Sequence, residues 1–148
     1  GTVFNVIPGE ARLSGTVRCF DRGVREAIPG WIEDVIVGTC AAHGCEPELD
    51  YRRLNSPLVN DPAMAAMVAD VARELAGPDS MEETTTLGGE DMGEFLDRVP
   101  GCFAFVGSRN EEKGIVAPHH HPAFDLDEDA LGLGVELTVR VARRFLGA

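Results

Sequence analysis

Three consecutive histidines are the side chains in this sequence best suited to chemistry. His119, His120 and His121 stand together in the segment PHHHPAFDLDE, and imidazole is a common metal ligand. Side chains on an extended segment alternate in direction, so one of the three, or the outer two, can reach a single ion. A zinc site needs three or four ligands. Spacing alone therefore leaves two interpretations open, a contribution to a metal site and a solvated polar loop.

Two other clusters have the residue types of functional sites and a simpler structural explanation. Cys40, His43 and Cys45 are close in the sequence, but their spacing matches no standard zinc pattern. Buried thiols at a helix end are the better interpretation. Glu90 and Asp91 follow two glycines, and paired carboxylates can bind metal or move protons. Carboxylates also favour a helix N-terminus, so capping is the favoured interpretation of this pair.

Asn5 and Arg18 are a fourth candidate because they lie on two strands of one predicted hairpin. Residues 2–7 are predicted to form a strand and Pro8-Gly9 a turn. Residues 10–20 alternate as a half-buried strand does, with Arg18 facing away from the core of the sheet. An amide and a guanidinium together suit a carboxylate. The pair alone predicts either carboxylate binding or two solvated side chains.

The first elements that must position these residues are a hairpin, a helix and a further strand. Apolar residues at helical spacing predict a helix from about residue 23 to residue 43. Pro29-Gly30 should kink or split this helix, and Gly44 is a natural C-cap. Residues 46–54 are predicted as a strand. This order of elements favours helices on one face of a mostly antiparallel sheet.

Composition changes near residues 55–62, and we place a domain crossing there. Asp61 has the character of an N-cap, with Pro62 at the first helical position. The helix that follows should end at Gly77-Pro78. Its apolar face is predicted to consist of Met64, Met67, Val68, Val71 and Leu75.

The last third of the chain is predicted to contain a buried strand and a terminal helix. Residues 87–101 suggest a Gly-rich loop that leads into a short helix. The continuous apolar run CFAFVG at residues 102–107 is typical of a strand covered on both faces. A loop at 108–126 then leads to a helix that starts after Asp127. The residues that this helix should bury are Leu131, Val135, Val139, Ala142 and Leu146.

The composition argues against several classes of protein. The net charge is −12, whereas nucleic-acid binding needs clustered Lys and Arg. No window contains the roughly 20 consecutive apolar residues of a membrane span, and no secretory signal is recognised. The four cysteines are too sparse for a disulfide scaffold. We therefore expect a cytoplasmic protein with reduced thiols that binds neither nucleic acid nor membrane.

Three segments in order resemble the signatures of one enzyme group. FNVIPGEARLSGTVRCFD is similar to the lid-domain signature of the two-metal amidohydrolases of aminoacylase, hippurate hydrolase and auxin-conjugate hydrolase type. GGEDMGEFLDRVPGCFAFVG and HHPAFDLDEDALGLGVEL resemble two further signatures of the same group. The resemblance covers nearly the whole chain, and three ordered motifs make it specific.

The resemblance implies an α/β fold in two parts. Residues 1–57 would be the second half of an α+β lid domain, which often forms the dimer contact. Residues 58–148 would be the C-terminal part of an α/β zinc-peptidase-like catalytic domain. A homodimer through the lid is the expected assembly.

The resemblance also assigns roles to particular residues. It implies that His120 is the last metal ligand of the family, although His119 stands where the family usually has an apolar residue. Asn5 and Arg18 match positions that bind the substrate carboxylate in related peptidases. The cofactors would be two divalent metal ions, zinc or manganese. The family's other ligands, its general base and a substrate-binding lid histidine lie upstream of the segments seen here.

The function implied by the resemblance is hydrolysis of the amide bond of N-acyl amino acids, such as hippurate, by the complete protein. The chain on its own is expected to be inactive, because one histidine cannot hold two ions. The alternative is a non-catalytic lid-type binding or dimerisation fragment, or a degenerate homologue. An intact-mass measurement against the full gene product separates these alternatives.

Overall fold

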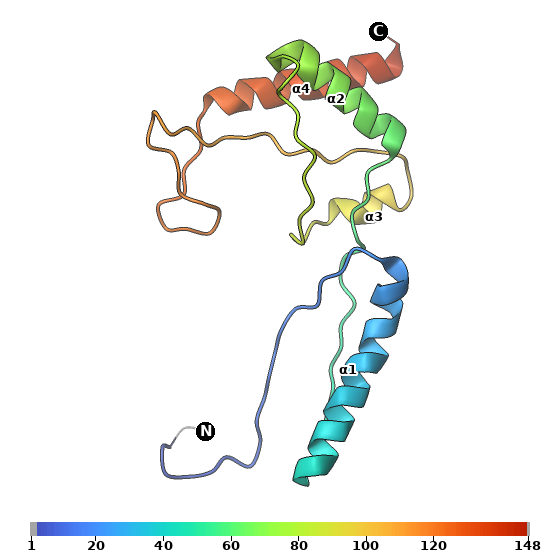
Figure 1. The fold of residues 1–148 in the computed structure, drawn as a ribbon, viewed down its shortest axis with the longest axis vertical. Coiled ribbons are helices and arrows are strands. Elements are labelled where there is room, and N and C mark those ends of the chain that lie inside the picture. Colours follow the sequence, from blue (N-terminus) through green and yellow to red (C-terminus); the bar gives the residue numbers. More distant parts are fainter. Residues whose placement is uncertain (1–2, 148) are drawn as a thin grey trace. The chain divides into compact units, whose positions relative to one another are not determined.

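The computed structural model describes residues 3–147, and these form four helices. The chain divides into two compact units, Gly1–Arg53 and Leu54–Ala148. The first unit contains one helix and the second contains three (Figure 1). Their bounds are Arg22–His43 for α1, Pro62–Ala76 for α2, Met92–Leu96 for α3 and Asp129–Leu146 for α4.

Helix α1 has the ends that the sequence predicts. The carboxylate of Asp21 accepts a hydrogen bond from the backbone N–H of Val24 at 2.8 Å, which caps the N-terminus. Gly44 ends the helix in the left-handed region, with φ of 66°. Pro29-Gly30 was expected to kink or split this helix; the split is wrong, because α1 runs unbroken through Pro29, and the kink stays a prediction. A proline removes one hydrogen bond of the helix, and the turns on both sides of Pro29 remain helical.

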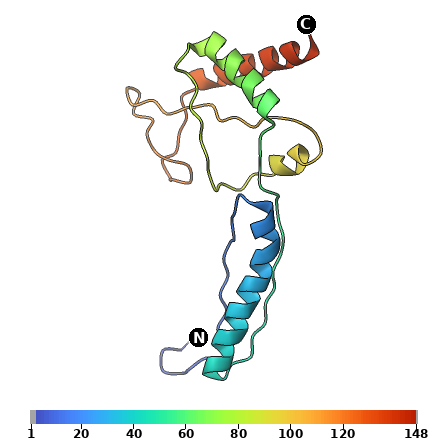
Figure 2. The same ribbon diagram turned by 45° about the vertical axis from the view of Figure 1, so that its right-hand side comes forward.

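The three strands predicted in the first unit do not form. Residues 3–6 make a turn, in which the N–H of Val6 donates to the C=O of Val3 at 3.4 Å, and residue 2 lies outside the described residues. Residues 10–19 and 45–53 are extended segments without ladder pairing, and residues 45–53 run beside α1 (Figures 1 and 2). Arg53 forms an ion pair with Glu26 of α1. Strand pairing needs a partner edge, and the extended segments of this unit form no recorded bridge with one another or with other described residues.

Helices α2 and α4 pack together and enclose the core of the second unit (Figure 1). Asp61 caps α2 by accepting from the N–H groups of Ala63 and Met64 at 2.9 and 3.0 Å. The start at Pro62 and the end at Gly77 therefore agree with the prediction. Among residues 3–147, the buried apolar side chains are Val68, Val71 and Ala72, all on α2, and Val71 alone is fully buried. Gly93 on α3 is buried as well. The guanidinium of Arg144 on α4 also pairs with both carboxylate oxygens of Glu74 on α2, at 2.8 and 2.6 Å.

The apolar face predicted to be buried on α4 is exposed. Val135 is 65% exposed and Leu146 is 76% exposed. The half-buried residues of α4 lie on a neighbouring face and include Ala130, Gly134, Leu137 and Val141. Helix α4 thus carries apolar residues on two faces. In the described structure, helix α2 packs against α4 but does not cover the face that contains Val135.

The strand predicted at residues 102–107 is an extended segment without a partner strand. The side-chain amide of Asn60 takes the place of such a partner. Its Nδ2 donates to the C=O of Phe103 at 2.9 Å, and its Oδ1 accepts from the N–H of Phe103 at 2.8 Å. Phe105 is 59% exposed, so the expected burial on both faces is wrong for this structure. The β-pairing recorded within residues 3–147 is an isolated bridge between Asn110 and Ile115. The described residues therefore do not form the expected α/β sheet.

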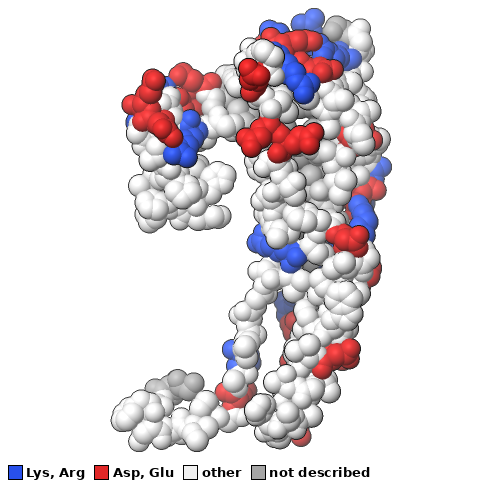
Figure 3. Space-filling view, viewed as in Figure 1, with Lys and Arg blue, Asp and Glu red and all other residues white. Residues whose placement is uncertain are grey.

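The charged surface agrees with the composition. On the face that Figure 3 shows, Lys and Arg are interspersed with Asp and Glu and are not gathered into a basic patch. Within residues 3–147, none of the helices combines the length and apolar character that a membrane crossing requires.

Candidate functional site

The three histidines lie in an exposed loop between the bridged turn at 110–115 and helix α4. We call residues 116–126 the histidine loop. The loop contains two successive turns, in which the N–H of His121 donates to Pro118 C=O at 3.2 Å and the N–H of Phe124 donates to His121 C=O at 2.9 Å. His120 is the third residue of the first turn and has φ of 66°. A type II turn needs a positive φ at its third residue, and the second turn, whose third residue is Ala123, has none there.

The structure gives each histidine a different role. The Nδ1 atom of His121 accepts from the N–H of Ala123 at 3.1 Å, which uses one ring nitrogen in the loop itself. The ring of His119 packs edge-on against Phe124, with centroids 5.0 Å apart. Within residues 3–147, the exposed ring of His120 makes no recorded hydrogen bond or ring contact. Both nitrogens of His120 are therefore available to a ligand.

The backbone of His120 is also unusual. It is the one residue other than glycine with positive φ in the described part of the chain. Such a conformation costs about 1–3 kcal/mol, and it persists where surrounding structure imposes it. Histidine, asparagine and aspartate tolerate it better than most residues do. Strain of this kind often occurs at functional sites, which supports His120 among the three candidates.

The described residues could supply one metal ligand, but they do not form a complete metal site. Within residues 3–147, no group of three or more His, Cys, Asp and Glu side chains could hold an ion. The cluster around His43 is not an exception, because the thiol of Cys45 donates to the backbone C=O of His43 at 3.7 Å. Burial raises the pKa of the Cys102 thiol, which disfavours a nucleophilic role. An exposed imidazole with two unused nitrogens, that of His120, suits a single ligand position.

Glu90 acts as a local cap, as its position before a short helix suggests. Its Oε1 accepts from the N–H groups of Asp91 and Met92 at 3.0 and 3.3 Å. The carboxylate of Glu94 accepts from the N–H of Ser56 at 2.7 Å. Gly93 is required here, because a Cβ atom would lie 2.6 Å from the backbone oxygen of Ser56. Glu90 and Glu94 thus both accept hydrogen bonds from the backbone, as a capping role requires.

The predicted substrate-binding pair, Asn5 and Arg18, lies on exposed segments of the first unit. Asn5 belongs to the turn at residues 3–6, and Arg18 belongs to the extended segment at 10–19. The antiparallel hairpin that was expected to bring the two side chains together is not formed. Their role in carboxylate binding stays a prediction.

Sequence reasoning missed an ionic network at the base of the histidine loop. The carboxylate of Asp127 accepts from Asn110 Nδ2 and from Lys113 Nζ, each at 2.6 Å. The same ammonium donates to Asp129 at 2.7 Å. Hydrogen bonds from Lys113 and then Asn110 lower the pKa of Asp127 to about 2, and Asp127 in turn raises the pKa of Lys113. Only the DLDE run before the helix offered a signal, since the partners are distant in sequence.

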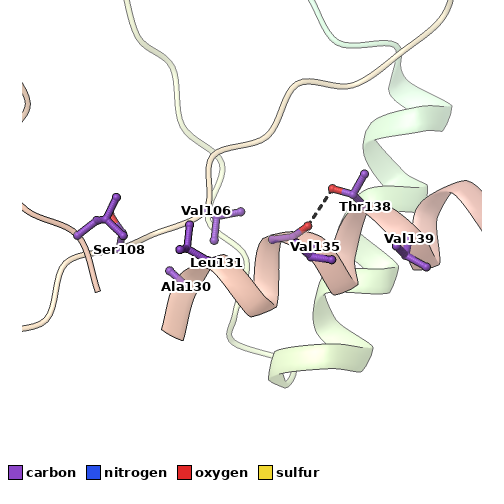
Figure 4. Close-up of a pocket in the computed structure, with 9 residues that line it drawn as sticks. Val106, Ser108, Ala130, Leu131, Val135, Thr138 and Val139 are labelled. Atoms are coloured by element: carbon purple, nitrogen blue, oxygen red, sulfur yellow. Dashed lines mark hydrogen bonds between the residues drawn. The ribbon is translucent and has the colours of Figure 1, made fainter. Parts of the chain in front are cut away.

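The second unit also has a shallow apolar groove of about 550 Å³. It follows the exposed face of α4, where Leu131, Val135 and Val139 lie in a row (Figure 4). The hydroxyl of Thr138 donates to the C=O of Gly134 at 2.8 Å and is thereby satisfied within the helix. No titratable group lines the groove. It is an exposed apolar surface of the second unit.

Two curated relatives match almost the whole chain. Thermostable carboxypeptidase 2 of Saccharolobus solfataricus is 32% identical over 146 residues, which are 98% of this chain and 37% of the carboxypeptidase. N-acetylcysteine deacetylase of Bacillus subtilis is 32% identical over 142 residues, which are 96% of this chain and 36% of the deacetylase. The chain thus spans little more than a third of the length of these relatives.

A solved structure and a family model point the same way. The crystal structure of the Bacillus subtilis YXEP protein, a dinuclear metal-binding peptidase of the M20 family, matches with a TM-score of 0.73 and 26% identity. The match covers 87% of this chain and 35% of that protein. The family model named Peptidase family M20/M25/M40 matches residues 5–144. Since that match takes in both units and the histidine loop, the chain belongs to peptidase family M20/M25/M40.

Proposed function

We propose that this chain is the C-terminal part of a metal-dependent amidohydrolase that cleaves the amide bond of N-acyl amino acids. The family membership supports the hydrolase class. Carboxypeptidase and N-acetylcysteine deacetylase are names that imply substrates with an amide bond next to a free carboxylate. One observation carries the proposal: the imidazole of His120 projects from a positive-φ turn with both nitrogens unused.

His120 would hold one of two divalent ions, zinc or manganese. Bound ions of this kind supply Lewis acidity and a water of lowered pKa. The relative solved as a crystal structure is a dinuclear metal-binding protein, which supports a count of two. The remaining ligands and the general base would come from parts of the protein outside this chain, because the described residues contain no further cluster of ligands.

Asn5 and Arg18 would bind the carboxylate end of the substrate. A guanidinium can donate two parallel hydrogen bonds to a carboxylate, and an amide adds a third donor. Such contacts fix the orientation of the scissile amide relative to the attacking water. In this proposal residues 1–57 act as the second half of a lid domain that also forms a homodimer.

The extended segments would complete an α/β fold when partner strands are present. Residues 10–20, 46–54 and 102–107 have the alternation or apolar runs of strands, but lack ladder partners within the described residues. The cytoplasm is the proposed location, which agrees with four cysteines that are all free thiols in the structure.

The experiment that tests this function is a substrate comparison with the complete protein. Hippurate and N-acetyl amino acids should be hydrolysed only with divalent metal present, and a chelator should abolish the activity. The same conjugates esterified at the carboxylate should be poorer substrates. A complete protein that binds metal but hydrolyses none of these amides would favour the alternative, a non-catalytic binding or dimerisation protein.

A further inference from the structure

The histidine loop is closed at its base by backbone hydrogen bonds. Asn110 and Ile115 exchange two such bonds, at 2.9 and 2.8 Å, and so form the bridged turn that precedes the loop. At the other end, the N–H of Asp127 donates to the C=O of Ser108 at 2.9 Å. The loop therefore begins and ends beside the same turn.

A half-buried carboxylate joins the two ends. The side chain of Asp127 is 13% exposed, whereas that of its partner Lys113 is 49% exposed. Asn110 and Lys113 come from the turn before the loop, and Asp127 and Asp129 come from the start of α4. A charge taken out of water needs such partners. The network is well satisfied, and we call these four residues the loop clamp.

The contacts recorded within the loop are local: two backbone turns, the bond from Ala123 to His121 and the packing of His119 on Phe124. Its first turn is closed by a bond of 3.2 Å, and its three histidines are exposed. The positive φ of His120 is unfavourable and needs support from elsewhere. In the described structure, the loop clamp supplies the charged contacts that fix both ends of the segment carrying His120.

We propose that the loop clamp is a positioning device, which holds His120 in the conformation that binds an ion. This inference rests on the proposed role of His120 as a metal ligand. The affinity of a site falls in proportion to the fraction of molecules in the binding conformation. Loss of the clamp should lower that fraction without removing any ligand atom. The effect should concern the ion held by His120 and not the second ion.

The test uses Lys113→Met and Asp127→Asn in the complete protein. Zinc affinity is measured for each ion with a competing chelator, and backbone hydrogen exchange is measured for residues 116–126. We expect both variants to weaken the ion at the His120 site by about 10–100-fold, the usual effect of removing a group that orients a ligand. Exchange in the loop should accelerate, and the affinity for the other ion should be unchanged.

Two control variants separate this effect from a general loss of charge. Lys113→Arg retains the cation and its donors, so it should keep the affinity of the wild type. Glu111→Gln removes the neighbouring ion pair with Arg109, at 3.0 Å, without touching Asp127. It should have no effect on either ion.

The outcomes distinguish the clamp from the ligand assignment. If His120→Asn loses one ion while Lys113→Met and Asp127→Asn bind zinc as the wild type does, the clamp proposal is overturned and the ligand stands. If His120→Asn keeps both ions, the ligand assignment fails and the clamp proposal fails with it. If both clamp variants lose the packing of α2 on α4, the network is a general stabiliser and the proposal is overturned.

Discussion

His120 combines a strained backbone with a side chain that makes no recorded hydrogen bond within residues 3–147. The two neighbouring histidines use their rings within the loop. His121 accepts a local hydrogen bond, and His119 packs on Phe124. His120 also differs from both neighbours in its backbone, because it has φ of 66°. The sequence alone could not choose among the three rings, because that choice depends on the conformation of the loop.

Arg18 carries a prediction about substrate binding. Arg18→Ala in the complete protein should raise KM for substrates with a free carboxylate. A lost charge-assisted contact costs about 1.5–3 kcal/mol, which is roughly a 10- to 150-fold change. The measurement is steady-state kinetics on an N-acyl amino acid and on its ester. The ester should show little penalty, and equal losses on both substrates would make Arg18 a structural residue.

The lowered pKa of Asp127 predicts that the histidine loop loses stability at acid pH. Its pKa is about 2 in the folded chain and 3.8 ordinarily. A lowered pKa means that the ionised carboxylate stabilises the loop above pH 4, and that this contribution is lost as pH falls from about 4 towards 2. Lys113 and Asp129 are the charged groups that face it, and Asn110 is its neutral donor. The side-chain amide signal of Asn110, which donates to Asp127, should therefore change in that pH range, and Asp127→Asn should remove this change.

At the scale of elements, helix ends could be predicted because their signals are local. The helix ends of α2 are marked by Asp61, Pro62 and Gly77, each within one turn of the end that it marks. Helix α2 begins and ends where these residues indicate. Strands could not be predicted in the same way. The run at 102–107 has the apolar character of a strand, but its pairing depends on residues far away, and Asn60 occupies its backbone groups instead. The network of Asn110, Lys113 and Asp127 was missed for the same reason.

The cap of α2 gives a prediction with an internal control. Asp61→Ala should destabilise the second unit by about 1 kcal/mol, since two backbone N–H groups lose their acceptor. Asp91→Ala is the matched control, because Asp91 precedes α3 without a side-chain capping bond. Urea unfolding followed by circular dichroism measures both. Similar losses in the two variants would show that the capping bond of Asp61 is not the cause.

At the scale of the whole molecule, the chain exposes more apolar surface than a self-sufficient domain does. Large exposed patches usually mark a surface that another structure covers, and the groove along α4 is one such surface. We expect the isolated 148-residue chain to self-associate. Val135→Asn with Val139→Asn should reduce the association seen in sedimentation velocity. Arg140→Gln, on the same helix but outside the groove, should leave it unchanged, and a monomeric wild-type chain would contradict the prediction.

The central claim is that this chain contributes one ligand, His120, to a two-metal centre completed elsewhere in the protein. The most direct test is the metal content of the complete protein, wild type against His120→Asn, after equilibration with zinc. Asparagine tolerates a positive φ, so the substitution keeps the turn and removes the imidazole. The account predicts two ions per chain in the wild type and one in the variant. Two firmly bound ions in both proteins would contradict it.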